Sequence, residues 1–235
     1  MGILVIVAHP DDEVLGFGAS GAKFADSGEV VRCCMLSGEV SARRNRPQNH
    51  ELRRDILTAQ EVLGFGKPIL GSFPNIQMNT VPHLELVRFI EAAMRDTKAE
   101  VLVTHHPNDL NDDHRQVAQA AMAAARLHQR SPGGGVPRLA ALLHMEVLSS
   151  TDWQFAPAGR AFNPDTYVEI GRRYLDRKIQ ALSTYREVMR PYPHPRSIQA
   201  IEAQAVLRGA ESGLDLAESF TTGYRLLLTA PKVRV

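Results

Sequence analysis

The sequence has few of the residues that build disulfide scaffolds or membrane spans. Its 235 residues include 2 cysteines, the adjacent pair Cys33 and Cys34. Neighbouring side chains of a strand point to opposite faces, so we expect two buried free thiols in a reducing compartment. No apolar run approaches the ~20 residues of a membrane-spanning helix. Residues 2–8 are apolar but lack the basic segment that begins a secretory signal. These absences predict a cytoplasmic protein without a membrane span.

The sequence also lacks an excess of charge of either sign. Lysine and arginine total 27, aspartate and glutamate total 26, and the formal net charge at pH 7 is +1. Nucleic acids and anionic membranes are bound through an excess of basic residues, so neither is expected as a partner. Hydrophobic residues make up 44% of the chain, which is ordinary for a globular protein with a sizeable core.

Apolar runs that suit strands alternate with amphipathic segments that suit helices. Buried strands are predicted at residues 3–8, 30–36, 68–70, 100–104 and 139–147. Helices are predicted between them at residues 14–27, 51–63, 82–97 and 113–127. This alternation predicts an α/β fold, namely a Rossmann-like, doubly wound, mostly parallel sheet with helices on both faces.

The pattern changes after the last of these strands. Helices are predicted at about residues 167–189 and 197–208, and residues 220–228 are predicted to form a closing strand. We treat residues 1–235 as one domain, with a core of about residues 1–148 and a C-terminal helical and strand extension of about residues 149–235. Residues 41–50, 71–79, 131–135 and 151–163 are predicted loops.

Polar residues gather where the predicted strands end. The first strand leads directly into an imidazole and three carboxylates, at His9, Asp11, Asp12 and Glu13. Adjacent carboxylates repel one another unless a cation lies among them. Another polar loop, residues 104–114, follows a later strand, and ligands of open α/β sheets bind at these carboxyl ends. If the loops meet, His9, Asp12 and His114 supply two imidazoles and one carboxylate, the usual ligand count of catalytic zinc.

Such a centre predicts hydrolytic chemistry. Zinc lowers the pKa of a bound water toward ~7 and polarises a scissile carbonyl, and a second carboxylate must then take up the proton. Asp11 is adjacent to Asp12 and is positioned for that task. Asp113 could accept the N–H of a ligand histidine, or it could simply cap its helix. His105 and His106 are expected to be structural or rim residues, with a role as alternative metal ligands left open. Iron or cobalt would also suit this ligand set.

The run Ala8-His9-Pro10-Asp11-Asp12-Glu13 resembles the signature of the PIG-L/LmbE-like zinc N-deacetylases. The resemblance covers most of the chain, including the Arg53-to-Gly64 helix, the Asp113-His114 pair and the alternating fold. It implies removal of an N-acetyl, or another N-acyl, group from an amino sugar, its conjugate or a related small molecule. It also implies one Zn²⁺ per chain bound by His9, Asp12 and His114, with Asp11 as general base and Arg53 at the edge of the site.

The sequence departs from that family at Asn111. Many members carry His-x-x-His, whose first histidine helps to stabilise the tetrahedral intermediate, and Asn111 occupies that position here. Asparagine can donate a hydrogen bond to an oxyanion, but it supplies neither a proton nor a positive charge. His194, which lies between two prolines, is the predicted catalytic replacement, with turn packing as the alternative. Arg196 is predicted to bind a substrate hydroxyl, phosphate or carboxylate. Asp109 is expected only to form an Asx turn.

Two other functions remain open. Residues 16–21, Gly-Phe-Gly-Ala-Ser-Gly, match the Gly-x-Gly-x-x-Gly fingerprint of a nucleotide-cofactor oxidoreductase. That motif should begin where the strand ends, whereas here carboxylates that repel a pyrophosphate intervene. Its glycines are therefore expected to allow close packing of the helix on the sheet. A metal-binding homologue without catalytic activity is the other alternative, because of Asn111. The sequence specifies neither the substrate nor the oligomeric state, and an oligomer of identical chains stays open.

Overall fold

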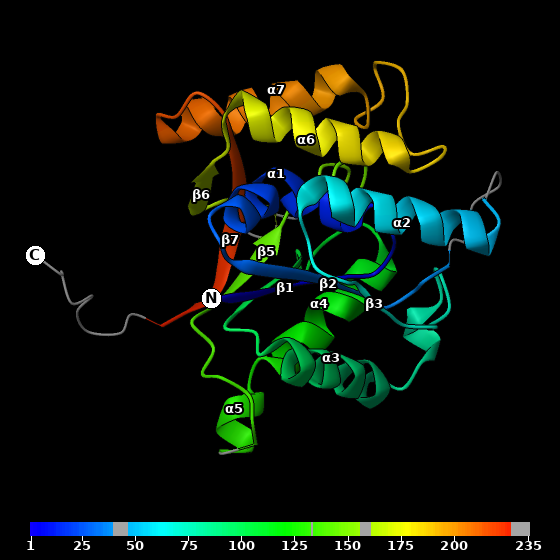
Figure 1. Cartoon of the computed structure of the whole chain (residues 1–235), viewed down its shortest axis with the longest axis vertical. Coiled ribbons are helices and arrows are strands. Elements are labelled where there is room, and N and C mark those ends of the chain that lie inside the picture. Colours follow the sequence, from blue (N-terminus) through cyan, green and yellow to red (C-terminus); the bar gives the residue numbers. More distant parts are fainter. Residues whose placement is uncertain (40–46, 133, 156–160, 227–235) are drawn as a thin grey trace, which may run out of the picture.

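The computed structural model describes residues 1–39, 47–132, 134–155 and 161–226 (Figure 1). Within them a seven-stranded sheet has the order β3-β2-β1-β4-β5-β7-β6. The strands are β1 (Gly2–Val7), β2 (Val30–Met35), β3 (Ile69–Leu70), β4 (Val101–His105), β5 (Ala141–Met145), β6 (Thr166–Glu169) and β7 (Ala217–Arg225). The first five run parallel, and β7 runs antiparallel to both β5 and β6. The predicted mostly parallel α/β sheet is confirmed.

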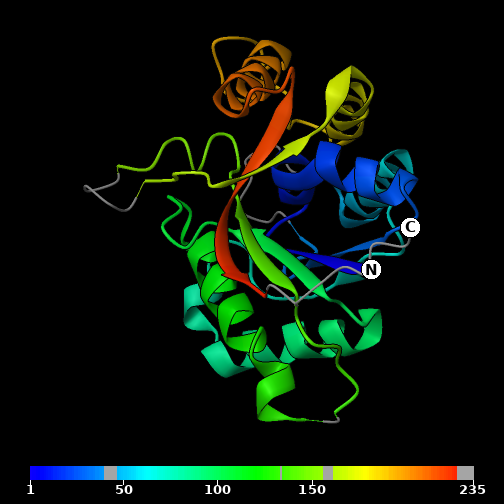
Figure 2. The same ribbon diagram turned by 90° about the vertical axis from the view of Figure 1, so that its left-hand side faces the viewer.

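Helices cover both faces of this sheet (Figures 1 and 2). They are α1 (Asp12–Asp26), α2 (Asn49–Leu63), α3 (His83–Thr97), α4 (Asp112–Ala124), α5 (Leu127–Arg130), α6 (Gly171–Thr184) and α7 (Ile198–Ser212), with a short 3₁₀ helix at Met78–Thr80. In Figure 1, α1, α2, α6 and α7 lie above the sheet, and α3 and α4 lie below it. None of the helices in the described ranges is long and apolar enough to cross a membrane.

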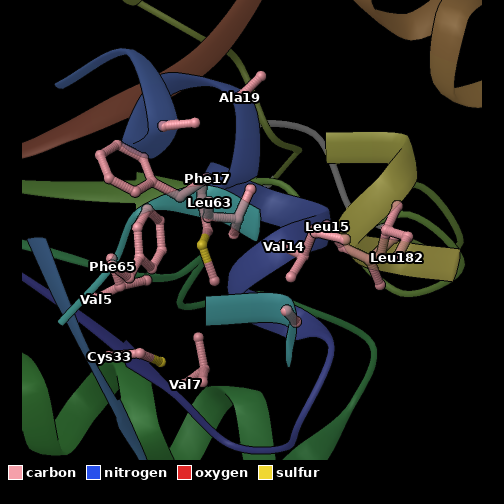
Figure 3. Close-up of a cluster of buried hydrophobic side chains, with 14 of the residues drawn as sticks. Val5, Val7, Val14, Leu15, Phe17, Ala19, Cys33, Leu63, Phe65 and Leu182 are labelled. Atoms are coloured by element: carbon pink, nitrogen blue, oxygen red, sulfur yellow. The ribbon is translucent and has the colours of Figure 1, made fainter. Parts of the chain in front are cut away.

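The apolar run of β1 is buried on both faces. Val5 and Val7 belong to the core on the side of α1 and α2, part of which is drawn in Figure 3, while Leu4 and Ile6 belong to the core on the side of α3 and α4. The cysteines of β2 divide in the same way, with Cys33 on the first side and Cys34 on the second. Both are buried free thiols, as their adjacency predicted.

The glycine motif of residues 16–21 lies inside α1 rather than between β1 and the helix. A Cβ atom on Gly16 would lie 2.3 Å from Sδ of Met145 on β5. A Cβ atom on Gly21 would lie 2.3 Å from Cζ of Phe65. These glycines therefore let α1 approach its neighbours closely, which is the packing role predicted for them.

The prediction of a helix over residues 167–189 is wrong at both ends. Its first residues form β6, and α6 occupies only Gly171–Thr184. β6 pairs with β7, whose residues lie about fifty positions further along the chain, and such a partner leaves no local signal. Four predicted segments lie partly outside the described residues: the loops at 41–50, 131–135 and 151–163, and the end of the strand at 220–228.

Candidate metal centre and active site

The carboxyl ends of β1, β4 and β5 meet at one cavity. Residues 8–11 link β1 to α1, residues 106–111 link β4 to α4, and residues 149 and 150 follow β5. Residue 196, just before α7, and the turn at residues 75 and 76 complete the walls of this cavity of about 240 Å³. The described lining residues are His9, Asp11, Asp12, Asn75, Ile76, Asn111, His114, Ser149, Ser150 and Arg196.

The three predicted ligands lie together in this cavity. His9, Asp12 and His114 are buried, and one potential ligand atom from each lies within 4.8 Å of the others. Oδ2 of Asp12 lies 3.5 Å from Nδ1 of His9 and 3.2 Å from Nε2 of His114. Two nitrogens and one oxygen therefore converge, as in the three-ligand sites of catalytic zinc.

In His9 and in His114, the ring nitrogen that does not face Asp12 contacts a second carboxylate. Nε2 of His9 lies 2.8 Å from Oδ2 of Asp113, and Nδ1 of His114 lies 3.2 Å from Oδ1 of Asp109. Such contacts orient a ligand histidine and raise its basicity, so Nδ1 of His9 and Nε2 of His114 are the atoms turned toward Asp12. Asp113 thus contacts one of the two predicted ligand histidines. The alternative prediction that Asp113 caps α4 is wrong, because the cap is Asn111.

The electrostatics of the cavity favour a cation. Burial opposes an imidazolium at His114, but Asp12 and Asp109 outweigh it and raise the pKa of His114 to about 10. Burial likewise opposes the Asp12 carboxylate, yet His114 and His9 hold the pKa of Asp12 well below its usual value. The residues present fit a divalent metal, because their nitrogen and carboxylate donors sit in a buried region that stabilises positive charge.

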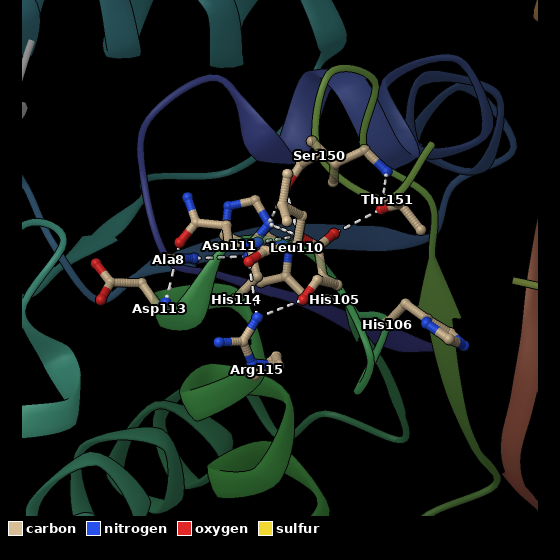
Figure 4. Close-up of polar contacts among 12 residues, drawn as sticks. Ala8, His105, His106, Leu110, Asn111, Asp113, His114, Arg115, Ser150 and Thr151 are labelled. Atoms are coloured by element: carbon tan, nitrogen blue, oxygen red, sulfur yellow. Dashed lines mark hydrogen bonds and ion pairs between the residues drawn. The ribbon is translucent and has the colours of Figure 1, made fainter. Parts of the chain in front are cut away.

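Asp109 contacts His114, and the sequence did not predict this contact. Asp109 does form the expected Asx turn, since its Oδ1 accepts the Asn111 N–H at 2.9 Å. The same carboxylate also accepts the hydroxyl of Ser150 and, at 2.6 Å, that of Thr151 (Figure 4). These hydroxyls lie about forty residues away, and the local sequence carries no signal that they reach Asp109.

His105 packs directly against the centre. Its ring stacks on His114 with centroids 3.8 Å apart, and its Nε2 accepts the Ala8 N–H at 2.9 Å (Figure 4). Burial, together with the nearby His114, lowers the pKa of His105 to about 3. The neutral ring therefore joins β4 to the end of β1, which agrees with the structural role expected for it.

Asp11 lies beside the predicted ligands with an unusual backbone. It precedes α1 at φ 101°, and its N–H donates to Oε2 of the buried Glu13 at 3.0 Å. Its own Oδ2 lies 3.3 Å from Nη1 of Arg196. Nε of Arg196 donates to Oγ of Ser149 at 2.7 Å. The arginine that was predicted to bind substrate therefore contacts both Ser149 and Asp11, the predicted base.

The buried Glu13 links this loop to two other segments of the chain. Its Oε1 accepts the hydroxyl of Tyr185 at 2.6 Å and the amide Nε2 of Gln60 at 3.0 Å. Burial raises the pKa of Glu13 to about 8, although the Tyr185 hydroxyl opposes the shift. Because Glu13 also binds the Asp11 N–H, it connects α2 and the end of α6 to the loop.

The remaining predicted residues differ in whether they line the cavity. Asn111 lines the cavity and caps α4, its Oδ1 accepting the Asp113 N–H at 2.9 Å. His194 is not among the described lining residues; its Nδ1 accepts the Arg196 N–H at 3.0 Å and its ring lies 5.5 Å from that of Trp153. Arg53 is exposed on α2 and also does not line the described cavity. The functional roles given to His194 and Arg53 stay predictions.

Residues 4–125, just over half of the chain, match the family described as PIG-L, GlcNAc-PI de-N-acetylase. The chain belongs to this family. It is also 29% identical over 196 residues to the uncharacterized deacetylase YaiS of Escherichia coli K12, and the match covers 79% of this chain and 90% of that protein.

Solved structures share the fold over nearly the whole chain. The conserved protein TT1542 of Thermus thermophilus has a TM-score of 0.77 and 24% identity, with full coverage of both chains. The N,N'-diacetylchitobiose deacetylase of Pyrococcus horikoshii has a TM-score of 0.71 and 16% identity, covering 94% of this chain and 82% of that one. GalB of Pseudomonas putida KT2440, a 4-carboxy-2-hydroxymuconate hydratase, has a TM-score of 0.72 and 18% identity, covering 98% and 100%. Because the same fold also carries a hydratase, the fold alone does not select the reaction.

Proposed function

We propose that the protein is a metal-dependent amide hydrolase that removes an N-acetyl, or another N-acyl, group from an amino sugar or a related small molecule. The observation that carries the proposal is the convergence of His9, Asp12 and His114 within 4.8 Å in a cavity that also contains Asp11. Membership of a de-N-acetylase family supports the same reaction. One Zn²⁺ per chain is the proposed cofactor.

Each residue of the cavity has a separate task in this proposal. Zn²⁺ bound there would polarise the amide carbonyl and make water a better nucleophile at neutral pH. His9, Asp12 and His114 hold the ion, and the contacts of Asp113 and Asp109 keep the two imidazoles turned toward it. Asp11 accepts the proton of the attacking water and passes it to the departing amine.

Two groups assist the developing charges. Arg196 lies 3.3 Å from Oδ2 of Asp11 and restricts the direction in which that carboxylate can turn. Oδ1 of Asn111 is used by the helix cap, so the Nδ2 group is the part of this side chain that can donate to the oxyanion. His194, whose Nδ1 accepts the backbone N–H of Arg196, holds the segment that carries this guanidinium group.

The structure around the glycine motif does not favour binding of a nucleotide cofactor. The glycine motif lies in the body of α1, and the N–H groups of Ala19 and Ser20 within it already donate to the Glu218 carboxylate, so they are not available to a pyrophosphate. Moreover, the first turn of α1 begins with the carboxylates of Asp12 and Glu13. Amide hydrolysis is therefore favoured over hydride transfer.

Acetate release tests the proposal. The protein would be incubated with N-acetylated amino sugars and their nucleotide and lipid conjugates, with and without a chelator, and its metal content would be measured in parallel. We expect about one divalent ion per chain and acetate release that the chelator abolishes. Bound metal without release from any of these compounds would instead indicate a metal-binding homologue that lacks this activity.

A further inference from the structure

One wall of the cavity differs in chemistry from the rest. Ten described residues line the cavity, and Ile76 contributes the one hydrocarbon side chain among them. The other nine offer imidazole, carboxylate, amide, hydroxyl or guanidinium groups. Ile76 is 50% exposed and belongs to neither buried core cluster of the described residues. The folded protein therefore gains little from an isoleucine at this position.

The backbone of Ile76 makes this choice of residue costly. Its φ is 60°, in the left-handed region that glycine and asparagine tolerate and β-branched residues avoid. Five described residues other than glycine have positive φ, and three of them, Asp11, Ile76 and Ser149, line this cavity. Strained residues of this kind collect at functional sites. An exposed isoleucine under such strain suggests that its side chain serves a purpose outside folding.

The turn that carries Ile76 is tied to a proposed metal ligand. The Ile76 N–H donates to Oδ2 of Asp113 at 2.6 Å, and the N–H of the buried Met78 donates to Oδ1 at 2.9 Å. The same Oδ2 lies 2.8 Å from Nε2 of His9. Asp113 thus fixes the turn and His9 relative to each other, so the Ile76 side chain stands at a set place beside the centre.

We propose that Ile76 is a specificity-determining residue whose side chain contacts an apolar part of the N-acyl substrate next to the scissile amide. This inference rests on the proposed function, because it assumes that the cavity binds an N-acyl compound. The apolar part belongs either to the acyl chain or to the amine-bearing half of the substrate. Both have the same chemistry, namely C–H surface that loses contact with water when the substrate binds.

Two variants separate substrate contact from a role in folding. Ile76→Gly removes the side chain and the strain together, and Ile76→Asn removes the hydrocarbon but keeps a side chain suited to positive φ. We expect both to melt no lower than the wild type, with a rise of about 2–4 °C for the glycine variant. We expect KM to rise roughly tenfold, at unchanged metal content and nearly unchanged kcat.

Lys98→Gly is the matched control. Lys98 also has positive φ, 51°, but it lies between α3 and the amino end of β4, whereas the cavity lies at the carboxyl ends of the strands. Its replacement relieves similar strain, and we expect KM to stay at the wild-type value. A similar rise in KM for this variant would show that strain relief alone alters binding, and it would overturn the assignment of Ile76.

A series of substrates locates the contact. If Ile76 meets the acyl chain, the loss of kcat/KM in Ile76→Gly grows from N-acetyl to N-butyryl to N-hexanoyl glucosamine. If it meets the amine-bearing half, the loss is constant along that series and larger for an octyl glycoside than for the free sugar. Unchanged KM in both variants, or lower melting temperature with equal losses on every substrate, would overturn the inference. A wild type that hydrolysed none of these compounds would instead overturn the proposed function on which the inference depends.

Discussion

Asp11 and Asp12 are neighbours in the chain, yet the structure separates their surroundings. Asp12 faces two imidazoles, whereas Asp11 faces Arg196 and has its N–H held by Glu13. The left-handed backbone of Asp11 makes this difference possible, because the chain turns sharply between the two carboxylates. The proposed ligand and the proposed base can therefore stand side by side without competing for the same ion.

Asp11→Asn is predicted to keep its metal and lose turnover. Asparagine has nearly the same shape but cannot accept the proton, so we expect kcat to fall by roughly 10²–10⁴-fold. Metal content and kcat would be measured on the same preparation. Asp26→Asn, at the far end of α1, is the control and should keep wild-type kcat. A rate for Asp11→Asn close to that of the wild type would remove Asp11 from the role of base.

Asp109→Asn is predicted to weaken metal binding. The variant loses the negative charge that lies 3.2 Å from Nδ1 of His114, and the imidazole becomes a poorer and less oriented ligand. We expect the metal affinity to fall about 10–100-fold, with activity partly recovered at high metal concentration. Competition with a coloured chelator would measure the affinity. Asp112→Asn, in the first turn of α4 and paired with Arg115, should leave the metal affinity unchanged, and equal affinities in all three proteins would argue against the role of Asp109.

The sequence could predict residues that carry their own local signal. His9 and Asp12 stand in a motif directly after a buried strand, and His114 follows a second strand of the same sheet, so strand order brought all three together. Asp109 and Ile76 were not found in this way. The partners of Asp109 lie on the loop after β5, and the importance of Ile76 lies in a backbone angle, which side-chain patterns do not reveal.

At the scale of elements, the local sequence pattern predicted the parallel strands correctly. It failed at β6, which pairs with the antiparallel strand β7. The strands β1, β2, β4 and β5 are apolar runs, because helices cover both of their faces. β6 is partly exposed and gains its place from pairing with β7. Tyr167 and Val168 are residue types that strands favour, but a strand of four residues is too short for its pattern to be separated from the helix that follows.

A buried ion pair joins α1, α6 and β7. Nζ of Lys178 donates at 2.7 Å to the Leu15 carbonyl and at 2.7 Å to Oε1 of Glu218. Glu218 accepts the N–H groups of Ala19 and Ser20. The pair thus binds backbone groups of α1 from two other elements, and it fixes α1 in place directly after the proposed centre.

Lys178→Met is predicted to destabilise the fold strongly. The change leaves the Glu218 carboxylate buried without its cation, which costs about 3 kcal/mol or more. For a chain of this length we expect the melting temperature to fall by roughly 6–12 °C. Arg172→Met, on the same helix but in exposed ion pairs, should leave the melting temperature nearly unchanged. Equal effects of the two changes in thermal unfolding would contradict the importance of the buried pair.

At the scale of the whole molecule, the proposed centre is assembled from segments that only the folded chain brings together. His9 and His114 are separated by about a hundred residues, and Ser150, Arg196 and the turn at Ile76 come from three further segments. The unfolded chain does not hold these groups within reach of one ion. A metal bound at this site therefore stabilises the native state over the unfolded state, and the stabilisation grows with metal concentration.

Removal of the metal is consequently predicted to lower both activity and stability. With free Zn²⁺ at about a hundred times its dissociation constant, the native state gains roughly 2.7 kcal/mol, which corresponds to a rise of about 5–10 °C in melting temperature. A chelator should abolish this rise together with turnover, and added Zn²⁺ should restore both. In His114→Ala, which lacks one proposed ligand, the melting temperature should not respond to Zn²⁺ or to the chelator. If the wild type also failed to respond while the metal content stayed at one per chain, the ion would lie elsewhere, because binding to these folded segments must stabilise them.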